Sequence, residues 1–356
     1  MSKITYLMLM HTTAINKEME IIRLVAGDFS RHPLQVNGLL EADAEIIRWP
    51  GKNEEYLVLK TDGIHEEIKE KLYEDPYLIG WMAVTAPISD IAAVGAQPTG
   101  ILLSVILPQE YDEKWLEQFK GGINEACSQY NIYVLGGDTN FGDHFSVSAT
   151  VVAGIKSQRP LLRKGMKPGD HLYATAPLGL GNAYAYARFF DTSLKVNYQP
   201  VARLSESRLI SKYATACMDS SDGLFPALAL LADINEVGFN LDVPLQNLLE
   251  KQASMIYHNA NLPAWMLMAG PHGEYELLFS VPREVGLDFE QAIKNEDWQP
   301  VYLGKITSGQ QINFSSGAMQ VQCSPATIPN LFYEANGNIQ LYFELLMQQH
   351  KTWVQQ

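Results

Sequence analysis

The sequence predicts two α/β domains, and the chain length, the composition and the pattern of elements support this fold class. The chain has 356 residues, more than one ordinary hydrophobic core accommodates. Apolar residues make up 47% of it and charged residues 19%, which is typical of a globular protein with sizeable cores. Helical and strand patterns alternate until a segment rich in proline, glycine and basic residues at 157–170. We therefore predict an N-terminal domain at 1–158 and a C-terminal domain at 159–356.

The first half of the chain begins with a helical pattern and continues with strands. Residues 17–29 have helical periodicity, and strand patterns follow at 44–49 and 56–62. The small and apolar residues at 78–96 predict two helical stretches that are interrupted at Pro87. The remaining predictions are a strand at 99–108, a helix at 113–130, a strand at 131–139 that ends in a glycine turn, and a strand at 145–155.

The second half also mixes both kinds of element. Its most informative stretch is ACMDSSDGLFPALALL (216–231), in which Ser and Asp residues precede an apolar run. Because their side-chain oxygens accept the free amide protons of a first helical turn, we expect them to start a helix that ends near Gly238. The other predictions are strands at 171–177, 273–282 and 299–306, and helices at 181–190, 200–214, 245–253 and 340–350.

The charge balance argues against polyanionic partners. The chain has 40 acidic and 26 basic residues, a formal net charge of -14 and no run rich in lysine or arginine. We therefore expect neither a nucleic acid nor an anionic membrane surface as a partner, whereas a nucleotide can bind an acidic protein through metal ions. The early apolar run ITYLMLM (4–10) is too short for a membrane span and lacks a cleavage-site pattern.

The three cysteines indicate a reducing compartment. They are Cys127, Cys217 and Cys323, an odd number with no C-x-x-C spacing. Such a set is typical of buried, inert thiols, so we expect a cytoplasmic protein without structural disulfides.

Aspartates recur at the ends of predicted elements. These positions are Asp43, Asp62, Asp90, Asp138 and Asp222. Backbone amides are free at such ends, and Mg²⁺ takes carboxylate oxygens together with water and substrate phosphates. A metal–nucleotide site therefore requires aspartates placed in this way. Each aspartate taken alone is explained more simply as a cap or turn residue, so the interpretation depends on the spacing of the whole set.

The spacing matches one known family. The chain resembles thiamine-monophosphate kinase, within the aminoimidazole ribonucleotide synthetase superfamily, from about Met19 to Ile306. The most specific motifs are ISDIAAVGAQP and MDSSDGL. The motifs that occur in the order of that family are TD (61–62), ISDIAAVGAQP (88–98), GGDT (136–139), RKGMKPGDHLYATAPLG (163–179), ATACMDSSDGL (214–224) and AGPHGEYELLF (269–279).

The resemblance implies an ATP- and Mg²⁺-dependent kinase. It would transfer the γ-phosphate of ATP to a small phosphorylated metabolite, with thiamine phosphate as the first candidate. The resemblance also implies the two-domain synthetase-like fold, with ATP in a cleft and N-terminal strands that pair across a homodimer. Because an ionised phosphate acceptor needs no general base, alignment and metal ions would carry the catalysis.

The site residues of the family are carried over position by position. The resemblance implies as metal ligands Asp43, Asp62, Asp90, Asp138 and Asp222, of which Asp90, Asp138 and Asp222 would be catalytic. It implies as residues beside the nucleotide and its metals Thr61, Gly136, Gly137, Thr139 and Ser221. Arg163 would contact a phosphate, with a solvated linker arginine as the alternative. Asp219 gains less from the resemblance, and a structural turn residue is an equally good interpretation of it.

Four departures separate this chain from the pattern of the family. Ala42 replaces one of two adjacent aspartates, which bears on the number of metal ions. The segment TDGIHEEI (61–68) is shortened, and Gly273-Glu274 stand in place of a Glu-Asp pair. The chain also ends in a polar helix where the kinases carry an aromatic segment near the substrate. The last three departures bear on the acceptor, so the nucleotide–metal site is better supported than thiamine phosphate as the substrate.

Two other function classes stay open at this point. The altered acceptor motifs are compatible with another ATP-dependent synthetase or cyclo-ligase of the superfamily. The cyclising synthetase of purine synthesis is a weaker match than the kinase, because MDSSDGL and EYELLF resemble the kinase versions of these motifs. Ala42 and GPHGEY (270–275) are compatible with a non-catalytic nucleotide-binding protein. Selenophosphate synthetases and hydrogenase-maturation members use a cysteine near one terminus. Here no cysteine precedes Cys127 and the chain ends in KTWVQQ, so both are disfavoured.

Overall fold

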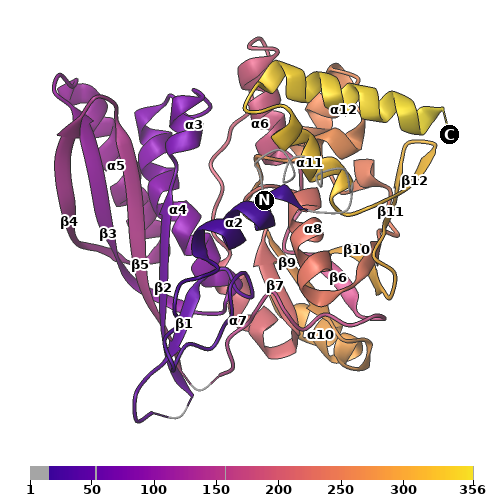
Figure 1. The fold of residues 1–356 in the computed structure, drawn as a ribbon, viewed down its shortest axis with the longest axis horizontal. Helices are drawn as coiled ribbons and strands as arrows, with labels where there is room; N and C mark the ends of the chain where they lie inside the picture. The colour runs from indigo at the N-terminus through magenta and orange to yellow at the C-terminus, as the bar shows by residue number, and fades with distance from the viewer. Residues whose placement is uncertain (1–15, 53, 157, 356) are drawn as a thin grey trace, which may run out of the picture.

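Two β-sheets, one from each half of the chain, organise the computed structural model (Figure 1). The structure describes residues 16–52, 54–156 and 158–355. The first sheet has five strands in the order β1-β2-β5-β3-β4, and the second has seven in the order β12-β11-β8-β10-β6-β9-β7. No helix among the described residues is long and apolar enough to cross a membrane, and the run at 4–10 lies outside these residues.

The first sheet is covered by helices on one face. Its strands are β1 (Glu45–Arg48), β2 (Glu55–Gly63), β3 (Gln97–Pro108), β4 (Tyr133–Gly142) and β5 (Ser146–Lys156). The helices of this half are α2 (Lys17–Ala26), α3 (His65–Lys69), α4 (Pro76–Ala93) and α5 (Glu113–Tyr130). Neighbouring strands are antiparallel except for β3 and β4, which are parallel. In Figure 1, α4 and α5 lie on one side of this sheet, and alternate residues of β5 are buried against them.

The opposite face of the first sheet is exposed along its outer strands. On the edge strand β4 the side chains of Tyr133 and Leu135 are 70% and 54% exposed, and Leu102 and Ile106 of β3 are also exposed. An exposed edge strand with apolar side chains is a surface that soluble proteins usually cover.

Two local predictions for the first half are wrong. The stretch at 78–96 is one continuous helix that contains Pro87, because every residue from Leu78 to Ala93 is buried and this packing outweighs the hydrogen bond lost at proline. Strand β4 also continues through the glycines that we expected to form a turn. A Cβ on Gly137 would lie 1.9 Å from the Leu103 carbonyl oxygen, so this glycine permits close pairing with β3.

The second sheet is enclosed by helices. Its strands are β6 (His171–Ala174), β7 (Ala216–Asp219), β8 (Gly238–Asn240), β9 (Leu277–Val281), β10 (Val301–Thr307), β11 (Ile312–Ser316) and β12 (Met319–Cys323). The α-helices of this half are α6 (Leu180–Phe189), α7 (Leu204–Tyr213), α8 (Leu224–Asn235), α9 (Lys251–Asn259), α10 (Gly286–Ile293), α11 (Thr327–Glu334) and α12 (Ile339–Val354). Three short 3₁₀ helices are described at Leu245–Asn247, Ala264–Met268 and Arg283–Val285. The hairpin of β11 and β12 was not predicted.

Helix α4 joins the two halves. It packs on the first sheet through β2, β3 and β5, and it also contacts α7 and β7 of the second half. The indole Nε1 of Trp81 donates a hydrogen bond of 2.7 Å to the Pro200 carbonyl oxygen across this junction. In Figure 1, α2 lies between the two halves. This arrangement brings the C-terminal end of α4 next to the end of β7, where the candidate site is found.

Candidate active site

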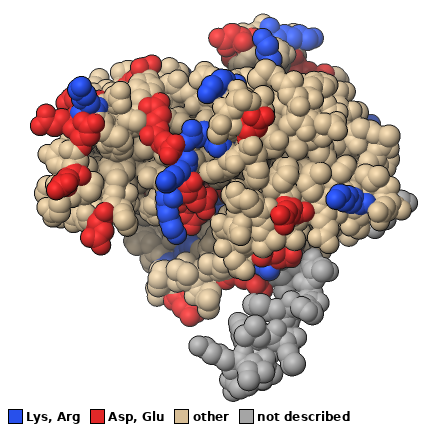
Figure 2. Space-filling model, turned by 90° about the horizontal axis from the view of Figure 1, so that it is seen from above, with Lys and Arg blue, Asp and Glu red and all other residues tan. Residues whose placement is uncertain are grey.

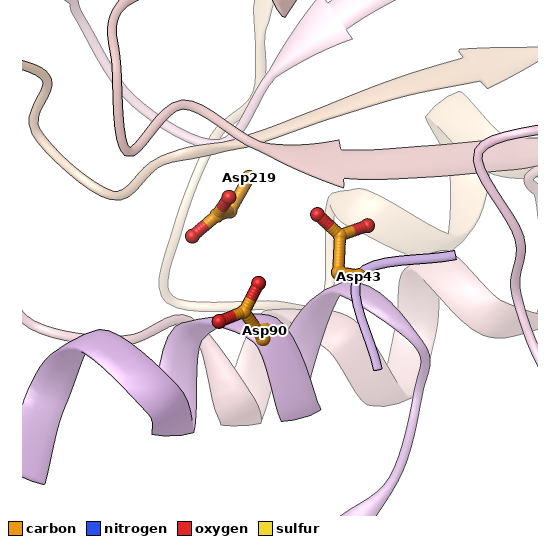
Figure 3. Close-up of side chains that lie close together, drawn as sticks. All are labelled: Asp43, Asp90 and Asp219. Atoms are coloured by element: carbon orange, nitrogen blue, oxygen red, sulfur yellow. The ribbon is translucent and has the colours of Figure 1, made fainter. Parts of the chain in front are cut away.

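Three aspartates from distant parts of the chain converge where the two halves meet (Figure 3). Asp43 precedes β1, Asp90 lies in the last turn of α4, and Asp219 is the final residue of β7. Each offers a carboxylate oxygen within 4.8 Å of the others, and the three side chains point toward one another. This spacing is compatible with oxygens that share one hard cation such as Mg²⁺. We call these residues the carboxylate cluster.

Two basic side chains contact the carboxylate cluster. The Lys60 Nζ of β2 lies 3.0 Å from Asp90 Oδ2. The Arg163 Nη2 donates a hydrogen bond of 2.8 Å to Asp43 Oδ1. The cluster therefore presents three carboxylates to two cations of the protein, and the balance favours a further positive charge.

Burial and mutual repulsion act on the protonation of the cluster. Burial raises the pKa of Asp90 well above its usual range, although the Lys60 charge opposes this shift. Burial and then the Asp43 charge raise the pKa of Asp219 to about 6, against a hydrogen bond of 2.7 Å from Ser89 Oγ. Burial alone would lower the pKa of Lys60, but the carboxylates of Asp90, Asp62 and Asp43 together outweigh it and the pKa is raised. A bound divalent cation would relieve the repulsion among the carboxylates.

One buried oxygen of the cluster lacks a partner among the described residues. This atom is Asp43 Oδ2, on a side chain that is 0% exposed. A buried polar atom without a partner is costly, so this carboxylate oxygen is suited to bind a cation. The donors of the cluster are all carboxylate oxygens, which Mg²⁺ prefers and softer metals do not. The residues therefore fit Mg²⁺.

The cluster adjoins a cavity of about 670 Å³ that both halves of the chain line. The acidic lining residues are Glu18, Asp43, Glu45, Asp62, Glu67, Asp90 and Asp222. Among the described lining residues the basic ones are Lys60 and Arg163. Figure 2 shows a hollow on one face of the molecule in which acidic and basic side chains lie next to each other. The cavity is thus strongly acidic and is suited to metal ions that accompany phosphates.

The cavity brings together residues that the sequence placed far apart. The predicted site residues that line it are Asp43, Thr61, Asp62, Asp90, Arg163, Ser221 and Asp222. Two of them already have hydrogen-bond partners. The Thr61 hydroxyl lies 2.8 Å from the hydroxyl of Thr150, and Asp62 Oδ1 accepts from the Gly63 amide at 2.9 Å.

The Ser-Asp stretch does not cap α8 as we expected. The N-cap is Gly223, with a φ of 91° that favours glycine, and no side chain caps the helix. Tertiary packing decides this, because a Cβ on Gly273 would lie 1.6 Å from the Ser220 carbonyl oxygen. The loop at 270–275 therefore packs directly on the loop at 220–223. Asp222 is exposed and lines the cavity.

The GGDT residues lie apart from the cluster. Gly136, Gly137, Asp138 and Thr139 are exposed residues of the edge strand β4. Asp138 pairs with Ser104 of β3, which pairs with Ser148 of β5, which pairs with Gly63 of β2. Two strands thus separate β4 from β2, a distance of roughly 14 Å at the usual strand spacing.

Asp138 also belongs to the other face of the first sheet. Asp62 pairs with Ala149, whose side chain is buried on the face covered by helices. Ser148, the neighbour of Ala149, lies in the row of Asp138 and therefore on the opposite face. Asp138 Oδ2 accepts a hydrogen bond of 2.6 Å from Asn140 Nδ2. Within one chain, Asp138 does not reach the carboxylate cluster.

The sequence interpretation missed Asp219 as a member of the cluster. Asp219 directly follows the apolar residues of β7, the same signal that drew attention to Asp62 and Asp138. The sequence alone leaves Asp219 equally explained as a structural turn residue. Lys60 and Glu18 were also missed, and no sequence signal distinguishes them from other charged residues of amphipathic elements.

Comparisons with known proteins agree with this geometry. A family profile described as AIR synthase related protein, N-terminal domain, matches residues 41–155. The thiamine-monophosphate kinase of Buchnera aphidicola subsp. Schizaphis graminum is 28% identical over 291 residues, which cover 78% of this chain and 86% of that protein. The chain is similar to AIR synthase-like proteins in sequence and in fold. Its similarity to the thiamine-monophosphate kinases extends over most of the chain.

Solved structures of AIR synthase-like proteins have the same fold. The structure of AaThiL complexed with AMPPCP and TMP has a TM-score of 0.67 at 22% identity and covers 86% of this chain and 94% of its own. The HypE-HypF complex has a TM-score of 0.65 at 15% identity and covers 83% and 95%. The predicted fold class and the family resemblance are therefore confirmed. Because differently named proteins of the AIR synthase-like superfamily share the fold, the function has to be argued from the site.

Proposed function

We propose that the protein is an ATP- and Mg²⁺-dependent kinase that transfers the γ-phosphate of ATP to a small phosphate monoester. Thiamine phosphate is the first candidate for the acceptor. The observation that carries the proposal is the carboxylate cluster, which three separate elements build beside an acidic cavity of about 670 Å³. A cavity of this size is within the usual range for a nucleotide-sized ligand. Homology to thiamine-monophosphate kinases over most of the chain supports the reaction class.

The residues of the carboxylate cluster and of the cavity would have different roles in phosphoryl transfer. Asp43, Asp90 and Asp219 would hold Mg²⁺, which neutralises phosphate charge and orients the γ-phosphate when bound. Asp62 and Asp222 line the same cavity and are available to further ions. Lys60 and Arg163 add positive charge to the lining of the cavity. Met19 and Ile22 of α2 contribute an apolar part of that lining. An ionised phosphate acceptor attacks without a general base, so positioning is the main task of the protein.

A smaller groove beside Asp222 supports a cationic acceptor. It has a volume of about 190 Å³, and its lining includes the α3 carboxylates Glu66, Glu67 and Glu70. The rings of Phe332 and Tyr333 of α11 line it as well, and its described lining contains no lysine or arginine. Carboxylates and aromatic faces both attract organic cations, and the thiazolium ring of thiamine phosphate is one.

The departures from the kinase pattern lie mainly on this acceptor side. Glu66 and Glu67 belong to the shortened segment at 61–68, and His272 belongs to the altered segment at 270–275. All three line the groove, and of them Glu67 also lines the larger cavity. The structure therefore supports nucleotide and metal binding more directly than it supports the choice of thiamine phosphate.

We further propose a homodimer that forms through the open face of the first sheet. The exposed apolar side chains of β3 and β4 are the surface that a second copy would cover. The site of one subunit would then be completed by Asp138 of the partner subunit. This arrangement accounts for a GGDT motif that cannot reach the cluster of its own chain.

The two sheets also support a division into two domains near residue 158, with the site between them. Of the described residues, the cysteines Cys127, Cys217 and Cys323 are free and buried, which supports a reducing cytoplasm as the location. The division into two domains and the cytoplasmic location belong to the proposed function.

Transfer of labelled phosphate tests the reaction. The protein is incubated with ATP labelled at the γ-position, Mg²⁺ and a panel of phosphate monoesters that includes thiamine phosphate. We expect label in an acceptor, and a loss of about 100-fold or more in Asp90→Asn, because an electrostatic contact of the transition state is removed. Asp233→Asn is the matched control, since Asp233 is an exposed residue paired with Arg23.

Two results would overturn this assignment. Label that is released only as inorganic phosphate would indicate a synthetase or cyclo-ligase. Tight binding of AMPPCP with no turnover of any acceptor would indicate a non-catalytic nucleotide-binding protein.

Subunit mixing tests the dimer. Asp90→Asn and Asp138→Asn should each be inactive alone, because each homodimer lacks one ligand in both sites. A refolded equimolar mixture should regain about one quarter of the wild-type activity, since half of the dimers are mixed and each has one intact site. No recovery in dimers that light scattering shows to be mixed would contradict a shared site.

A further inference from the structure

Lys60 occupies an unusual position for a lysine. It lies two residues after Val58, on the face of β2 that the helices cover, and its strand partner Val151 is fully buried. Its side chain is only 24% exposed and lines the cavity. Lysine is rarely placed inside a protein unless an acidic partner compensates its charge. Here that partner is Asp90, a member of the carboxylate cluster.

The two cations at the cluster are held differently. Arg163 is 14% exposed, its planar guanidinium bonds to Asp43, and its own amide donates to the Glu41 carbonyl oxygen at 2.8 Å. Lys60 has one ion pair among the described residues, at 3.0 Å to Asp90. An ammonium on a flexible four-carbon stem moves easily between oxygen ligands, whereas a fixed guanidinium does not. Lys60 is therefore the exchangeable cation of the two.

A divalent ion and Lys60 compete for the same oxygen. Asp90 is one of the three cluster residues, and its Oδ2 is the atom that Lys60 contacts. A cation bound to Asp90 reduces its attraction for the ammonium and repels it directly. The displaced ammonium remains beside the cavity, because the Lys60 backbone is fixed in the β2–β5 ladder. The favourable partners for it are then Asp62, which lines the same cavity, and the phosphates of a bound nucleotide.

We propose that Lys60 is an exchangeable counter-ion, which neutralises Asp90 in the metal-free protein and moves to the phosphate chain when a divalent cation and nucleotide bind. The second half of this statement rests on the proposed kinase function, whereas the first half does not. In this role Lys60 lowers the affinity of the empty site for divalent ions and raises its affinity for the metal–nucleotide complex. The two effects have opposite signs, which distinguishes the role from a purely structural one.

The test measures both affinities in Lys60→Met, which keeps the length of the side chain and removes its charge. Mn²⁺ binding without nucleotide is followed by electron paramagnetic resonance of the free ion. We expect Mn²⁺ to bind about tenfold more tightly than in wild type, because its competitor is gone. AMPPCP binding at saturating Mn²⁺ is followed by calorimetry. We expect it to be about tenfold weaker, because a phosphate contact is lost.

Two further variants keep the result interpretable. Lys52→Met removes a lysine that is exposed and paired with Glu55 outside the cavity, and it should change neither affinity. Lys60→Arg keeps the charge and should leave the Mn²⁺ affinity at or below that of wild type. Circular dichroism of each variant establishes that it is folded.

The outcomes separate the two proposals. Unchanged or weaker Mn²⁺ binding in folded Lys60→Met would overturn the counter-ion role. Unchanged AMPPCP binding in that variant would overturn the phosphate contact. Failure of the wild-type protein to bind AMPPCP at all would defeat the kinase proposal, while the Mn²⁺ measurement would still decide the counter-ion role.

Discussion

The carboxylate cluster and the GGDT segment of β4 have the same kind of residue in opposite surroundings. Asp43, Asp90 and Asp219 are buried between the two halves of the chain and face one another. Asp138 is exposed on an edge strand, and its side chain accepts a hydrogen bond from Asn140 on the same strand. The cluster is assembled by one chain, whereas Asp138 of the GGDT segment lies on the opposite face of the sheet from Asp62 and does not reach the cluster.

A buried set of carboxylates opposes folding unless cations compensate its charge. The stability of the fold therefore depends on the ion pairs with Lys60 and Arg163 and on any divalent ion that binds the cluster. The exposed Asp138 has no such cost, and its contribution would depend on a second subunit. The predictions below separate the two regions, beginning with the largest expected effect.

Removing a charge from the cluster should destabilise the protein strongly. Asp43→Asn leaves Arg163 buried without its partner, and we expect the free energy of unfolding to fall by about 3–5 kcal/mol. Urea denaturation with a chelator present measures this. The double variant Asp43→Asn with Arg163→Met should be more stable than the single one. A loss below about 0.5 kcal/mol in the single variant would mean that the buried pair does not stabilise the fold.

The stability of the metal-free protein should depend on pH through Asp219. Its pKa is raised to about 6 by burial, from an ordinary value near 3.8, so the folded state binds more protons than the unfolded state between these pH values. The stabilisation by this proton is fully present below about pH 4 and is lost as the pH rises through 6, by roughly 3 kcal/mol. Unfolding free energies of wild type and Asp219→Asn at a series of pH values measure it. Parallel curves for the two proteins would refute the prediction.

Mg²⁺ should stabilise the fold through the cluster. At a concentration about 100 times its Kd, an ion that binds only the folded state adds about 2.7 kcal/mol. Thermal unfolding with Mg²⁺ and with a chelator tests this, and Asp90→Asn should lose the difference. The exposed variant Asp233→Asn should retain it. Equal midpoints for the wild-type protein in both buffers would show that the cluster does not hold the ion.

The smallest expected change is at the GGDT segment. Asp138→Asn should alter the free energy of unfolding by less than about 0.5 kcal/mol, because the side chain is exposed. Urea denaturation of dilute protein measures this value. A larger loss of unfolding free energy would show that Asp138 stabilises its own chain, as the aspartates of the cluster are expected to do.

Local sequence patterns predicted most elements but failed where distant packing competes with them. The strands at 56–62 and 145–155 and the helix at 113–130 are present close to their predicted limits. Pro87 did not interrupt its helix, because both halves of the chain bury that helix. The Ser-Asp stretch did not cap α8, because the loop at 270–275 occupies the space around it.

The candidate site was predictable in part for the same reason. Strand-end aspartates and their spacing indicated Asp43, Asp62, Asp90 and Asp222, and all four line one cavity. Asp219 carried the same local signal and was missed, since a turn residue and a ligand look alike in sequence. Lys60 could not be found at all, because its partner Asp90 is 30 residues away and approaches it only through packing of α4 on β2.

The sequence by itself determined the residue types, their order and the alternation of elements, and hence the fold class and the family. These properties are local or additive along the chain, so periodicity and motif spacing reveal them. Only the tertiary structure decided which carboxylates meet, which cations accompany them, and that Asp138 lies on the opposite face from Asp62. The reason is physical. Sheet order and strand register determine the face and the neighbours of each side chain, and both depend on contacts between residues far apart in the sequence.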